Sequence, residues 1–462
     1  MELNGSFQNR MSELLGDGFK AYMDSFDEES VKAFHLNLSV ISADAFSEWE
    51  SCLDDIDYSK IPDSPYGFYY KSEQIGRTPA HHSGMIYSQD PSAMAVLSCV
   101  GLEKDESPRI LDLCAAPGGK TSQLAIASAG KGIVVANEPN PSRNQVLCSN
   151  IERMGFGNVL VTKSEPAELA SVFPSYFDLI LTDVPCSGEG MFRKYPESVN
   201  EWSEENIRNC VSRSKEILEN AVSMLRPGGR LIFSTCTYAP EENEQTCRML
   251  TDDLGLIYDK APEYTLKHAL YSELSGGKGY RFYPHLFKGE GQFVSYFKKP
   301  GESRTCATGN DIGIKKASSD ILKQIDNCFG GMPDIDISRI FIYKDRVIYL
   351  AGGIDRLPAR GMTMAGVNIG KQDGKNFTPH HHVFSALGRR LPTYVELGTD
   401  RSLMEAYLRG EEIRLTDALK DNSKLKDKCF GAVLFAGVPV GGFKYAGGKL
   451  KNHYPKGLRN LR

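Results

Sequence analysis

The sequence predicts an α/β protein whose central domain is a parallel sheet with helices on both faces. Two observations carry this prediction. Between residues 109 and 238, short apolar runs typical of strands alternate with longer amphipathic runs typical of helices. Strands separated by helices of this length are joined by right-handed crossovers and lie parallel in one sheet. The chain has 462 residues, which is too long for one ordinary core, so we expect further domains on either side.

The elements of the central domain follow one another in a regular order. The apolar runs that we expect to form strands are 109–114, 132–138, 158–163, 176–185 and 230–238. The runs that we expect to form helices are 118–129, 141–155 and 206–229. Function in open parallel sheets collects at the carboxyl ends of the strands, and the unusual residues of this chain follow the strands.

Four units are expected along the chain. They are an N-terminal α+β subdomain, the central domain, a linker with a small α+β module, and a last α+β module, over residues 1–75, 76–300, 301–385 and 386–462. The last two units together form a C-terminal α+β appendage.

Local patterns predict the elements of the outer units. In the first unit we expect helices around Met11–Phe19 and next to Val31, and a strand over 35–41. In the appendage, a hairpin is expected to turn at Lys344-Asp345, and two later strands are expected to turn at Val438-Pro439.

Composition excludes several classes of protein. No apolar run reaches the ~18 residues of a membrane-spanning helix, and the N-terminus lacks the apolar region of a secretion signal. The 11 cysteines are dispersed and form no CxxC pair, which argues against a disulfide framework or a zinc ribbon and fits a reducing compartment. We therefore expect a cytoplasmic protein that does not bind a membrane.

Charge is distributed unevenly along the chain. The net charge is −5, but residues 1–60 hold 13 acidic and four basic side chains. Residues 444–462 hold six basic side chains and no acidic one, which indicates contact with a polyanion. A solvated tail is the alternative. Tyr445, Leu450 and Tyr454 count against it, because a disordered tail is usually polar.

A glycine-rich turn follows the first expected strand. In DLCAAPGGKT (112–121), glycines allow a ligand to approach the backbone, and the helix N-terminus offers free N–H groups. The spacing is neither a dinucleotide fingerprint nor a P-loop. Glu138, at the end of the second strand, is placed to accept hydrogen bonds from both hydroxyls of a ribose. Together they indicate a nucleoside site that suits S-adenosylmethionine, and a simple tight turn is the alternative.

Two cysteines follow neighbouring strands. TDVPCSGEG (182–190) places Asp183 and Cys186 at the end of one apolar run, and FSTCTY (233–238) places Cys236 at the end of the next. A thiol in such a setting can act as a nucleophile. The two thiols could converge on one cleft, and a pair of buried structural thiols is the alternative.

These motifs resemble those of the Nol/Nop/Sun family of RNA cytosine-C5 methyltransferases. The stretches that match are DLCAAPGGKT, DVPCSGEGMFRK, STCTYAPEENE and, over residues 76–94, GRTPAHHSGMIYSQDPSAM. The resemblance covers about residues 60–300. LKNHYPKGLR (450–459) is similar to the end of the bacterial branch that methylates ribosomal RNA and carries a PUA-like module.

The resemblance implies a Rossmann-like methyltransferase core with S-adenosyl-L-methionine as its cofactor. The implied reaction is methyl transfer to C5 of a specific cytidine in RNA through a covalent bond from cysteine to C6. The implied partner is 16S (small-subunit) ribosomal RNA or the small ribosomal subunit, and we expect no DNA partner and a monomer.

The resemblance also implies roles for individual residues. Cys236 attacks C6 of the ring, Cys186 promotes release, and Asp183 protonates or hydrogen-bonds N3. Lys120 contacts the target base. Glu165 stands where the family more often has Asp beside the adenine. The implied cofactor-binding residues are Cys114, Ala115, Ala116, Pro117, Gly118, Gly119, Lys120, Glu138, Glu165 and Asp183.

Residues near the motifs are candidates for holding the RNA. We expect Phe192, Arg193 and Lys194 to stack on and grip the nucleotides that flank the target. His81 and His82 either line the RNA path or have a structural role.

The sequence also leads to expectations for an acidic run, for the segment around His35 and for a run of three histidines. Glu241, Glu242 and Glu244 are expected to stabilise the first turn of the next helix. His35-Leu36-Asn37 stands where the family usually has Arg-x-Asn, so a phosphate contact of that Arg is weakened or relocated here. His380–His382 are adjacent and cannot converge on one ion, so we expect no metal site.

Three other functions compete with this reading. Transfer RNA could be the substrate, because only the appendage favours ribosomal RNA. In DNA cytosine methylation the thiol of the Pro-Cys motif attacks, and the additional Cys236 counts against that class. A non-catalytic RNA-binding assembly factor would have no use for both thiols, Asp183 and Glu138.

Overall fold

The structure is a computed structural model. The residues that it describes are 3–41, 50–53, 56–98, 101, 107–128, 131–302, 313–351, 356–374, 376–414 and 425–459. Most of the linker expected after residue 300 lies outside the described residues.

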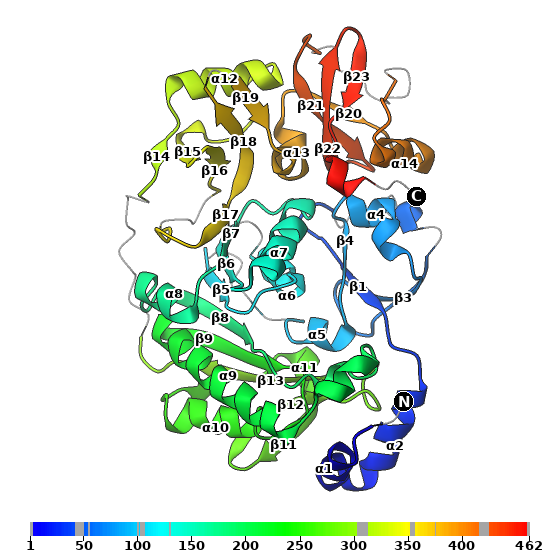
Figure 1. The fold of residues 1–462 in the computed structure, drawn as a ribbon, viewed down its shortest axis with the longest axis vertical. Helices are drawn as coiled ribbons and strands as arrows, with labels where there is room; N and C mark the ends of the chain where they lie inside the picture. The colour runs from blue at the N-terminus through cyan, green and yellow to red at the C-terminus, as the bar shows by residue number, and fades with distance from the viewer. Residues whose placement is uncertain are drawn as a thin grey trace.

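A ten-stranded sheet forms the centre of the molecule (Figure 1). Five of its strands are parallel, in the order β9-β8-β5-β6-β7. Their bounds are Leu225–Thr235, Phe177–Asp183, Arg109–Asp112, Ile133–Asn137 and Val159–Thr162. Strands β5, β6 and β7 are buried on nearly every residue, as expected for a parallel sheet covered on both faces. The α/β prediction is confirmed.

Antiparallel strands extend the parallel set at both edges. β13 (Gln292–Lys298) pairs with β9 and leads to β12 (Gly277–Phe282) and β11 (Leu270–Leu274), and the short β10 (Ile257–Tyr258) pairs with β13. At the other edge, β17 (Met362–Ala365) pairs with β7. A strand from the C-terminal half of the chain therefore belongs to the central sheet.

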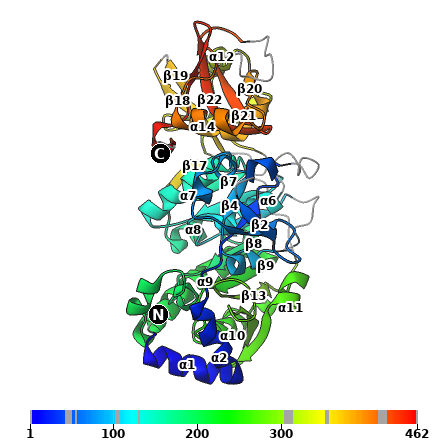
Figure 2. The ribbon, with the colours of Figure 1, turned by 90° about the vertical axis from the view of Figure 1, so that its right-hand side faces the viewer.

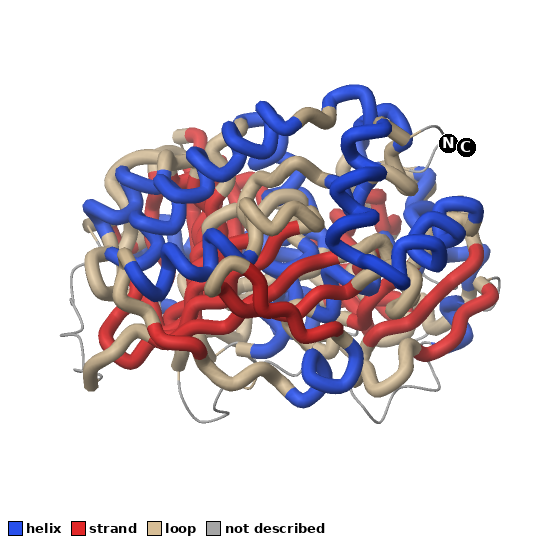
Figure 3. Tube along the Cα trace, turned by 90° about the horizontal axis from the view of Figure 1, so that it is seen from below, coloured by secondary structure: helices blue, strands red, loops and turns tan. Residues whose placement is uncertain are grey.

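Helices cover both faces of this sheet (Figure 3). One apolar cluster joins the sheet to α8 (Pro166–Val172), α9 (Glu204–Met224) and α10 (Glu244–Asp252). The opposite cluster joins it to α5 (Pro91–Ala95), α6 (Gly119–Ala127), α7 (Pro141–Arg153) and α11 (Glu263–His268). Local chemistry sets the starts of these helices: Asn140 caps α7 ahead of Pro141, and Ser203 caps α9.

One helix boundary differs from the expected one. We expected α9 to continue to residue 229, but the helix ends at Met224 and β9 begins at Leu225. Pro227 disfavours helical backbone at the residue before it, and Gly228 has a φ of +76°.

The N-terminal residues form two separate structures. α1 (Gly5–Leu15) and α2 (Phe19–Asp24) lie at one end of the molecule, in blue in Figure 2. An antiparallel sheet follows, in the order β2-β3-β1-β4. Its strands are Asp57–Lys60, Gly67–Lys71, Ala33–Leu36 and Ile86–Ser88.

Two expectations for this region need correction. No helix forms next to Val31, because residues 29–32 have no regular secondary structure and lead directly into β1. The strand expected over 35–41 starts earlier and ends at Leu36, where the buried Asn37 side chain leaves the sheet to bind two carbonyls.

The appendage contains two further sheets. The first has the order β14-β15-β16-β18-β19, and the second has the order β20-β21-β22-β23. The strands of the first are Lys315–Lys316, Ile340–Tyr343, Arg346–Tyr349, Val367–Asp373 and Asn376–Pro379, with α12 (Ser319–Phe329) and α13 (His381–Leu387). The second contains Tyr394–Glu396, Phe430–Phe435, Val438–Ala446 and Lys449–Asn452, with α14 (Arg401–Arg409).

One of the two expected turns is confirmed. β15 and β16 turn at Lys344-Asp345, where Lys344 has a φ of +59°. The turn expected at Val438-Pro439 is wrong, because both residues lie in β22. The chain turns at Ala436 and Gly437, whose φ values of +48° and +73° match the twist that a two-residue hairpin requires.

The appendage packs firmly on the rest of the chain. One apolar cluster contains Phe34 and Tyr70 of the N-terminal sheet together with Val433, Leu450 and Tyr454 of the last sheet. Leu450 and Tyr454 are buried, so the aromatic and apolar residues within the basic C-terminal stretch belong to a folded unit. Among the described helices, none is long and apolar enough to cross a membrane.

Candidate active site

The two thiols singled out in the sequence lie in contact. Asp183 ends β8 and pairs in register with Ser234 of β9, so the loops that follow these parallel strands leave the sheet side by side. Sγ of Cys186 lies 3.2 Å from Sγ of Cys236, and both cysteines are free thiols. The convergence of the two strand ends is confirmed, and the chemical role of each thiol stays a prediction.

The pKa of Cys186 is well above the ordinary range of a thiol. The largest cause is its hydrogen bond with Cys236, followed by burial. The carboxylate of Glu242 adds to the effect. Cys186 therefore keeps its proton at neutral pH and can donate it or share it with its neighbour.

Asp183 is fixed by three side chains. Lys120 forms an ion pair with one carboxylate oxygen, with Nζ 2.8 Å from Oδ2. Ser234 and Gln292 donate hydrogen bonds to the other oxygen, Oδ1, at 2.6 and 3.0 Å. Lys120 follows β5 and Asp183 ends β8, so their ion pair spans the point at which the strand order reverses. Ligands of open α/β sheets bind at this point.

The glycine-rich turn between β5 and α6 is held from behind by α7. Arg143 donates to the carbonyl oxygen of Ala116 at 3.0 Å, and Asn150 donates to that of Pro117 at 2.9 Å. The Ala116–Pro117 peptide bond is cis. Gly118 has a φ of +113°, and a Cβ there would lie 3.0 Å from Leu147 Cδ1, so only glycine suits this position.

Two acids expected at the cofactor differ in their surroundings. Glu138 is buried at the end of β6, where Oε1 accepts from the Asn140 backbone N–H at 3.0 Å and Oε2 lies 3.3 Å from the Arg143 guanidinium. Glu165 is exposed, and it caps α8 in a reciprocal capping box with Glu168. Its contact with an adenine stays a prediction.

Two of the residues expected to grip RNA are buried. Phe192 is 1% exposed and packs edge-on against Phe7 of α1 at 5.1 Å. The side chain of Arg193 is 7% exposed and forms an ion pair with Glu290 at 2.8 Å. The expected role of these two in RNA binding is wrong, because Phe7 covers the ring of Phe192 and the guanidinium of Arg193 is bound by Glu290 and by the carbonyl oxygens of Ser25 and Gly289. Lys194 is exposed.

Of the three acids after Cys236 that were expected in the first turn of a helix, Glu244 lies there and Glu241 and Glu242 do not. α10 begins only at Glu244, whose carboxylate is buried in an ion pair with Arg281. Glu241 forms an ion pair with Arg10 of α1 at 2.7 Å. Glu242 is buried and accepts hydrogen bonds from the backbone N–H and the hydroxyl of Ser187. Each of the three acids therefore binds another part of the chain.

The histidines of the N-terminal region are structural. His35 is fully buried, stacks on Tyr87 with ring centroids 5.6 Å apart, and lies 2.9 Å from the hydroxyl of Ser122. It therefore takes no phosphate contact in place of an arginine. His82, at the end of the short helix α4 (Pro79–His82), lies 3.1 Å from the hydroxyl of Tyr454, so it joins this helix to the last module.

Five residues that the structure places in the site were not predicted to belong to it. They are Ser187, Glu189, Ser234, Glu242 and Gln292. Glu189 and Glu242 lie within the quoted motifs, and acidic side chains beside both thiols were a signal that could have drawn attention to them. Nothing local marks Gln292, which reaches Asp183 from a strand 109 residues later. Among the described residues, no cluster of three potential metal ligands is present.

Comparisons with known proteins show the family to which the chain belongs. Family models match residues 99–298 ("16S rRNA methyltransferase RsmB/F"), 3–91 ("N-terminal domain of 16S rRNA methyltransferase RsmF") and 394–460 ("Methyltransferase RsmF PUA domain"). Ribosomal RNA small subunit methyltransferase F of Shewanella loihica is 30% identical over 421 residues, which are 87% of this chain and 84% of that protein. The chain belongs to the RsmB/F methyltransferase family. A further relative with the same description, from Vibrio vulnificus, is 28% identical over 96% of this chain and 93% of its own length.

Solved structures support the same assignment. A methyltransferase homologue from Pyrococcus horikoshii is 25% identical and has a TM-score of 0.54, with 64% of this chain and 95% of that chain covered. As a member of the RsmB/F family, the protein is an S-adenosylmethionine-dependent RNA methyltransferase with a Rossmann-like core and a C-terminal PUA domain.

The residues present suit this cofactor. The turn at Gly118 and Gly119 is free of Cβ atoms, and a Cβ at Gly119 would lie 3.1 Å from both Gln89 and Tyr87. The buried carboxylate of Glu138 follows the next strand, at the place where a ribose is bound in folds of this kind. Such a turn and such an acid match the nucleoside and amino-acid parts of S-adenosylmethionine without a pyrophosphate site.

Proposed function

We propose that this RsmB/F enzyme methylates C5 of a specific cytidine in 16S ribosomal RNA through a covalent bond between Sγ of Cys236 and C6 of the ring. The observation that carries the proposal is the contact between the thiols of Cys186 and Cys236, beside the fixed carboxylate of Asp183. A reaction on oxygen or on an exocyclic nitrogen has no use for two thiols at one strand end. The names of the relatives, which describe small-subunit ribosomal RNA methyltransferases, support the choice of substrate.

The reaction requires a nucleophilic residue of the enzyme, because C5 of cytosine by itself is too weak a nucleophile to attack the methyl group. Addition of the Cys236 thiolate to C6 pushes electrons to C5, which then resembles the carbon of an enamine. S-adenosylmethionine, when bound, supplies an electrophilic sulfonium methyl group. After the transfer, the proton on C5 leaves, the C5–C6 double bond re-forms, and the Sγ–C6 bond breaks.

Asp183 and Lys120 balance the charge that the attack creates. Negative charge develops on the pyrimidine ring as sulfur adds to C6. We assign to Asp183, in its protonated form, the protonation or hydrogen bonding of N3, and we assign to Lys120 a contact with the base. Their ion pair, with 2.8 Å between Nζ and Oδ2, keeps both groups in a defined orientation before the base arrives.

Cys186 is assigned to release. Its raised pKa supports this role, because the thiol stays protonated while its neighbour attacks. A thiol that holds a proton 3.2 Å from the attacking sulfur can return that proton to the leaving thiolate of Cys236. The Cys186 thiolate that this leaves is then the base that takes the C5 proton, so both thiols end protonated.

The cofactor is assigned to the residues that surround the glycine-rich turn. We propose contacts from Cys114 through Lys120, from Glu138 to the ribose hydroxyls, from Asp183, and from Glu165 to the adenine. Glu165 is exposed, so its carboxylate is accessible to a ligand although the same carboxylate caps α8.

The RNA must present an unstacked cytidine, because C6 is inaccessible within a base-paired stack. The PUA domain carries exposed lysines, among them Lys449, Lys451 and Lys456, which suit contact with phosphates. We further propose that the enzyme acts in the cytoplasm as a monomer, and on RNA rather than DNA.

Methylation of defined substrates tests the proposal. The purified protein is incubated with tritiated S-adenosylmethionine and, in separate reactions, with unmethylated 16S ribosomal RNA, small subunits and total transfer RNA. Bisulfite sequencing then locates 5-methylcytosine. We expect one modified cytidine in the ribosomal RNA or the subunit. Modification of transfer RNA alone would overturn the substrate assignment, and tritium at any atom other than C5 would overturn the chemistry.

A further inference from the structure

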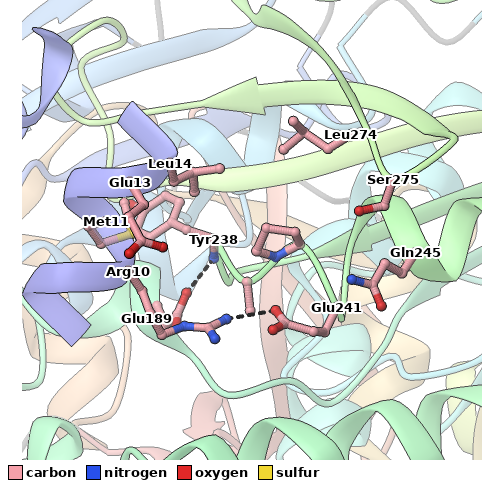
Figure 4. Close-up of a pocket in the computed structure, with 12 residues that line it drawn as sticks. Arg10, Met11, Glu13, Leu14, Glu189, Tyr238, Glu241, Gln245, Leu274 and Ser275 are labelled. Carbon is pink, nitrogen blue, oxygen red and sulfur yellow. Dashed lines mark hydrogen bonds and ion pairs between the residues drawn. The ribbon is translucent and has the colours of Figure 1, made fainter. Parts of the chain in front are cut away.

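Two buried carboxylates join the loops that carry the thiols, and each belongs to one loop and is bound by the other. Glu189 lies in the loop of Cys186, and its Oε2 accepts hydrogen bonds from the other loop, from Thr237 Oγ1 at 2.9 Å and from the Tyr238 backbone N–H at 2.8 Å. Figure 4 shows the contact between Glu189 and Tyr238. Glu242 lies in the loop of Cys236 and accepts hydrogen bonds from Ser187 of the opposite loop. Glu189 and Glu242 are 2% exposed.

The carboxylate of Glu242 binds the opposite loop in the same way. Oε2 of Glu242 accepts from the Ser187 backbone N–H at 3.0 Å, and Oε1 accepts from the Ser187 hydroxyl. The same hydroxyl lies 2.7 Å from Thr237 Oγ1, the group that binds Glu189, so the two contacts between the loops lie side by side. Each loop therefore supplies one carboxylate and binds the carboxylate of the other loop. The residues that bind them, Ser187 and Thr237, directly follow Cys186 and Cys236.

A backbone contact completes the link. The N–H of Gly190 donates to the carbonyl oxygen of Cys236 at 2.8 Å. A Cβ at Gly190 would lie 2.9 Å from that oxygen, so glycine is needed for the loops to approach this closely. Trp202 fixes the rotamer of Glu189 by donating to Oε1 at 2.8 Å.

We propose that Glu189 and Glu242 are positioning residues that hold the thiols of Cys186 and Cys236 in contact, so that one cytosine can meet both sulfurs in turn. This inference rests on the proposed function for its purpose, but the geometry that it describes exists in the protein without RNA. Neither carboxylate is assigned a contact with the substrate. Each acts through the loop that it binds.

The energetics favour a role in geometry over a role in stability. Burying a carboxylate costs several kcal/mol, about as much as its hydrogen bonds return, and well-packed apolar side chains would stabilise a fold at least as well. Burial raises the pKa of Glu242 to about 7, which is the signature of this cost. Only as a carboxylate can Glu242 accept from the N–H and the hydroxyl of Ser187 through separate oxygens without donating.

The rate of disulfide formation measures the contact directly. Diamide removes one hydrogen from each of two thiols, joins them in a disulfide and is itself reduced to the hydrazine. The full-length protein is treated with diamide without RNA or cofactor, quenched with an alkylating reagent, digested, and analysed by mass spectrometry for the Cys186–Cys236 peptide pair. This readout ignores the other cysteines.

The variants separate positioning from folding. Glu189→Ala and Glu242→Ala remove each carboxylate, Glu189→Gln and Glu242→Gln keep its shape and one acceptor, and Ser187→Ala removes one donor. Glu241→Ala is the matched control, because its carboxylate belongs to the neighbouring residue and binds Arg10 instead. Circular dichroism at the assay temperature selects folded variants, and the Gln and Ser187→Ala variants carry the test if an Ala variant fails to fold.

We expect the alanine variants to form the disulfide at least tenfold more slowly than the wild type, with partial recovery in the glutamine variants and less than a twofold change in Glu241→Ala. Loss of Glu242 also lowers the pKa of Cys186, which by itself would accelerate oxidation, so a slower rate reports geometry. An unchanged rate in folded Glu189 and Glu242 variants overturns the inference. Because no RNA is present, failure of the proposed function would leave this result unaffected.

Discussion

Sγ of Cys186 lies 3.2 Å from Sγ of Cys236, although the two residues are 50 positions apart in the chain. The contact exists because β8 and β9 are neighbouring parallel strands whose carboxyl ends lie in register. At this distance a pyrimidine ring that is bonded to one sulfur stays within reach of the other. The pair thus allows attack and release to be divided between two residues of one site.

Replacement of Asp183 by Asn tests the charge balance of the site. Asparagine keeps the shape but loses the ion pair with Lys120, so we expect methyl transfer to fall by about 10²- to 10⁴-fold with little change in RNA affinity. Ser234→Ala is the matched control, because it removes a single hydrogen bond from the same carboxylate. We expect it to lower the rate of methyl transfer by about tenfold. Initial rates with tritiated S-adenosylmethionine report the effect. Activity of Asp183→Asn within tenfold of the wild type would contradict the role.

Introduction of arginine at His35 tests whether this position contacts RNA. His35 is buried between Tyr87 and Ser122, and an arginine there would be a buried cation at a place where burial and the nearby charge of Arg153 already lower the pKa of the histidine. We expect His35→Arg to lower the free energy of unfolding by about 3–5 kcal/mol, measured by urea denaturation. Tighter RNA binding together with unchanged stability would show that the side chain reaches solvent and phosphate.

Stability at alkaline pH should respond to Glu152. Burial raises the pKa of this carboxyl to about 7, and nearby Arg346 lowers it only in part. The folded state therefore holds the proton more tightly than the unfolded state, and stability falls as pH rises from about 4.5 to 7. Glu152→Gln carries no such proton. We expect its stability relative to the wild type to be greater by about 1–3 kcal/mol at pH 8 than at pH 5. An equal difference at both pH values would contradict the shift.

Neutralisation of exposed lysines in the PUA domain tests the RNA surface. Replacing Lys449, Lys451 and Lys456 by Ala should weaken RNA binding uniformly across sequences and reduce the slope of log affinity against log salt by about 2. Cofactor affinity should not change. Lys20→Ala, an exposed lysine on α2, is the control. Filter binding at several salt concentrations measures both quantities, and an unchanged slope would place the RNA elsewhere.

Truncation after residue 300 should destabilise the whole protein. The removed part includes β17, which covers the β7 edge of the central sheet, and Val433 and Leu450, which pack with Phe34 of the N-terminal sheet. We expect a lower Tm and exposed apolar surface, seen as dye binding. A truncated protein that melts like the full chain would show that these contacts contribute nothing.

The sequence predicted those parts of the fold that follow from local patterns. Alternating apolar and amphipathic runs identified β5 to β9 and their helices, because burial on both faces of a parallel sheet leaves a continuous apolar run. The convergence of Cys186 and Cys236 followed from the rule that neighbouring parallel strands end at one edge.

The failures share one physical cause, which is contact between distant segments. Phe192 and Arg193 look like RNA-binding residues after a catalytic motif, but Phe7 of α1 packs on the first, and Glu290, 97 positions later, pairs with the second. Glu242 looks like a residue of a helical first turn, but Ser187, 55 positions earlier, takes its carboxylate. Periodicity and spacing do not encode such pairs.

Trapping of the RNA–protein adduct tests the central claim most directly. Cys186→Ala, Cys236→Ala and the double variant are incubated with 16S ribosomal RNA and S-adenosylmethionine, then analysed on a denaturing gel. We expect Cys186→Ala to accumulate a covalent complex, because Cys236 attacks and release is slow. Cys236→Ala and the double variant should form none and should not methylate. A complex in Cys236→Ala that disappears in Cys186→Ala would reverse the roles of the two thiols and contradict the account.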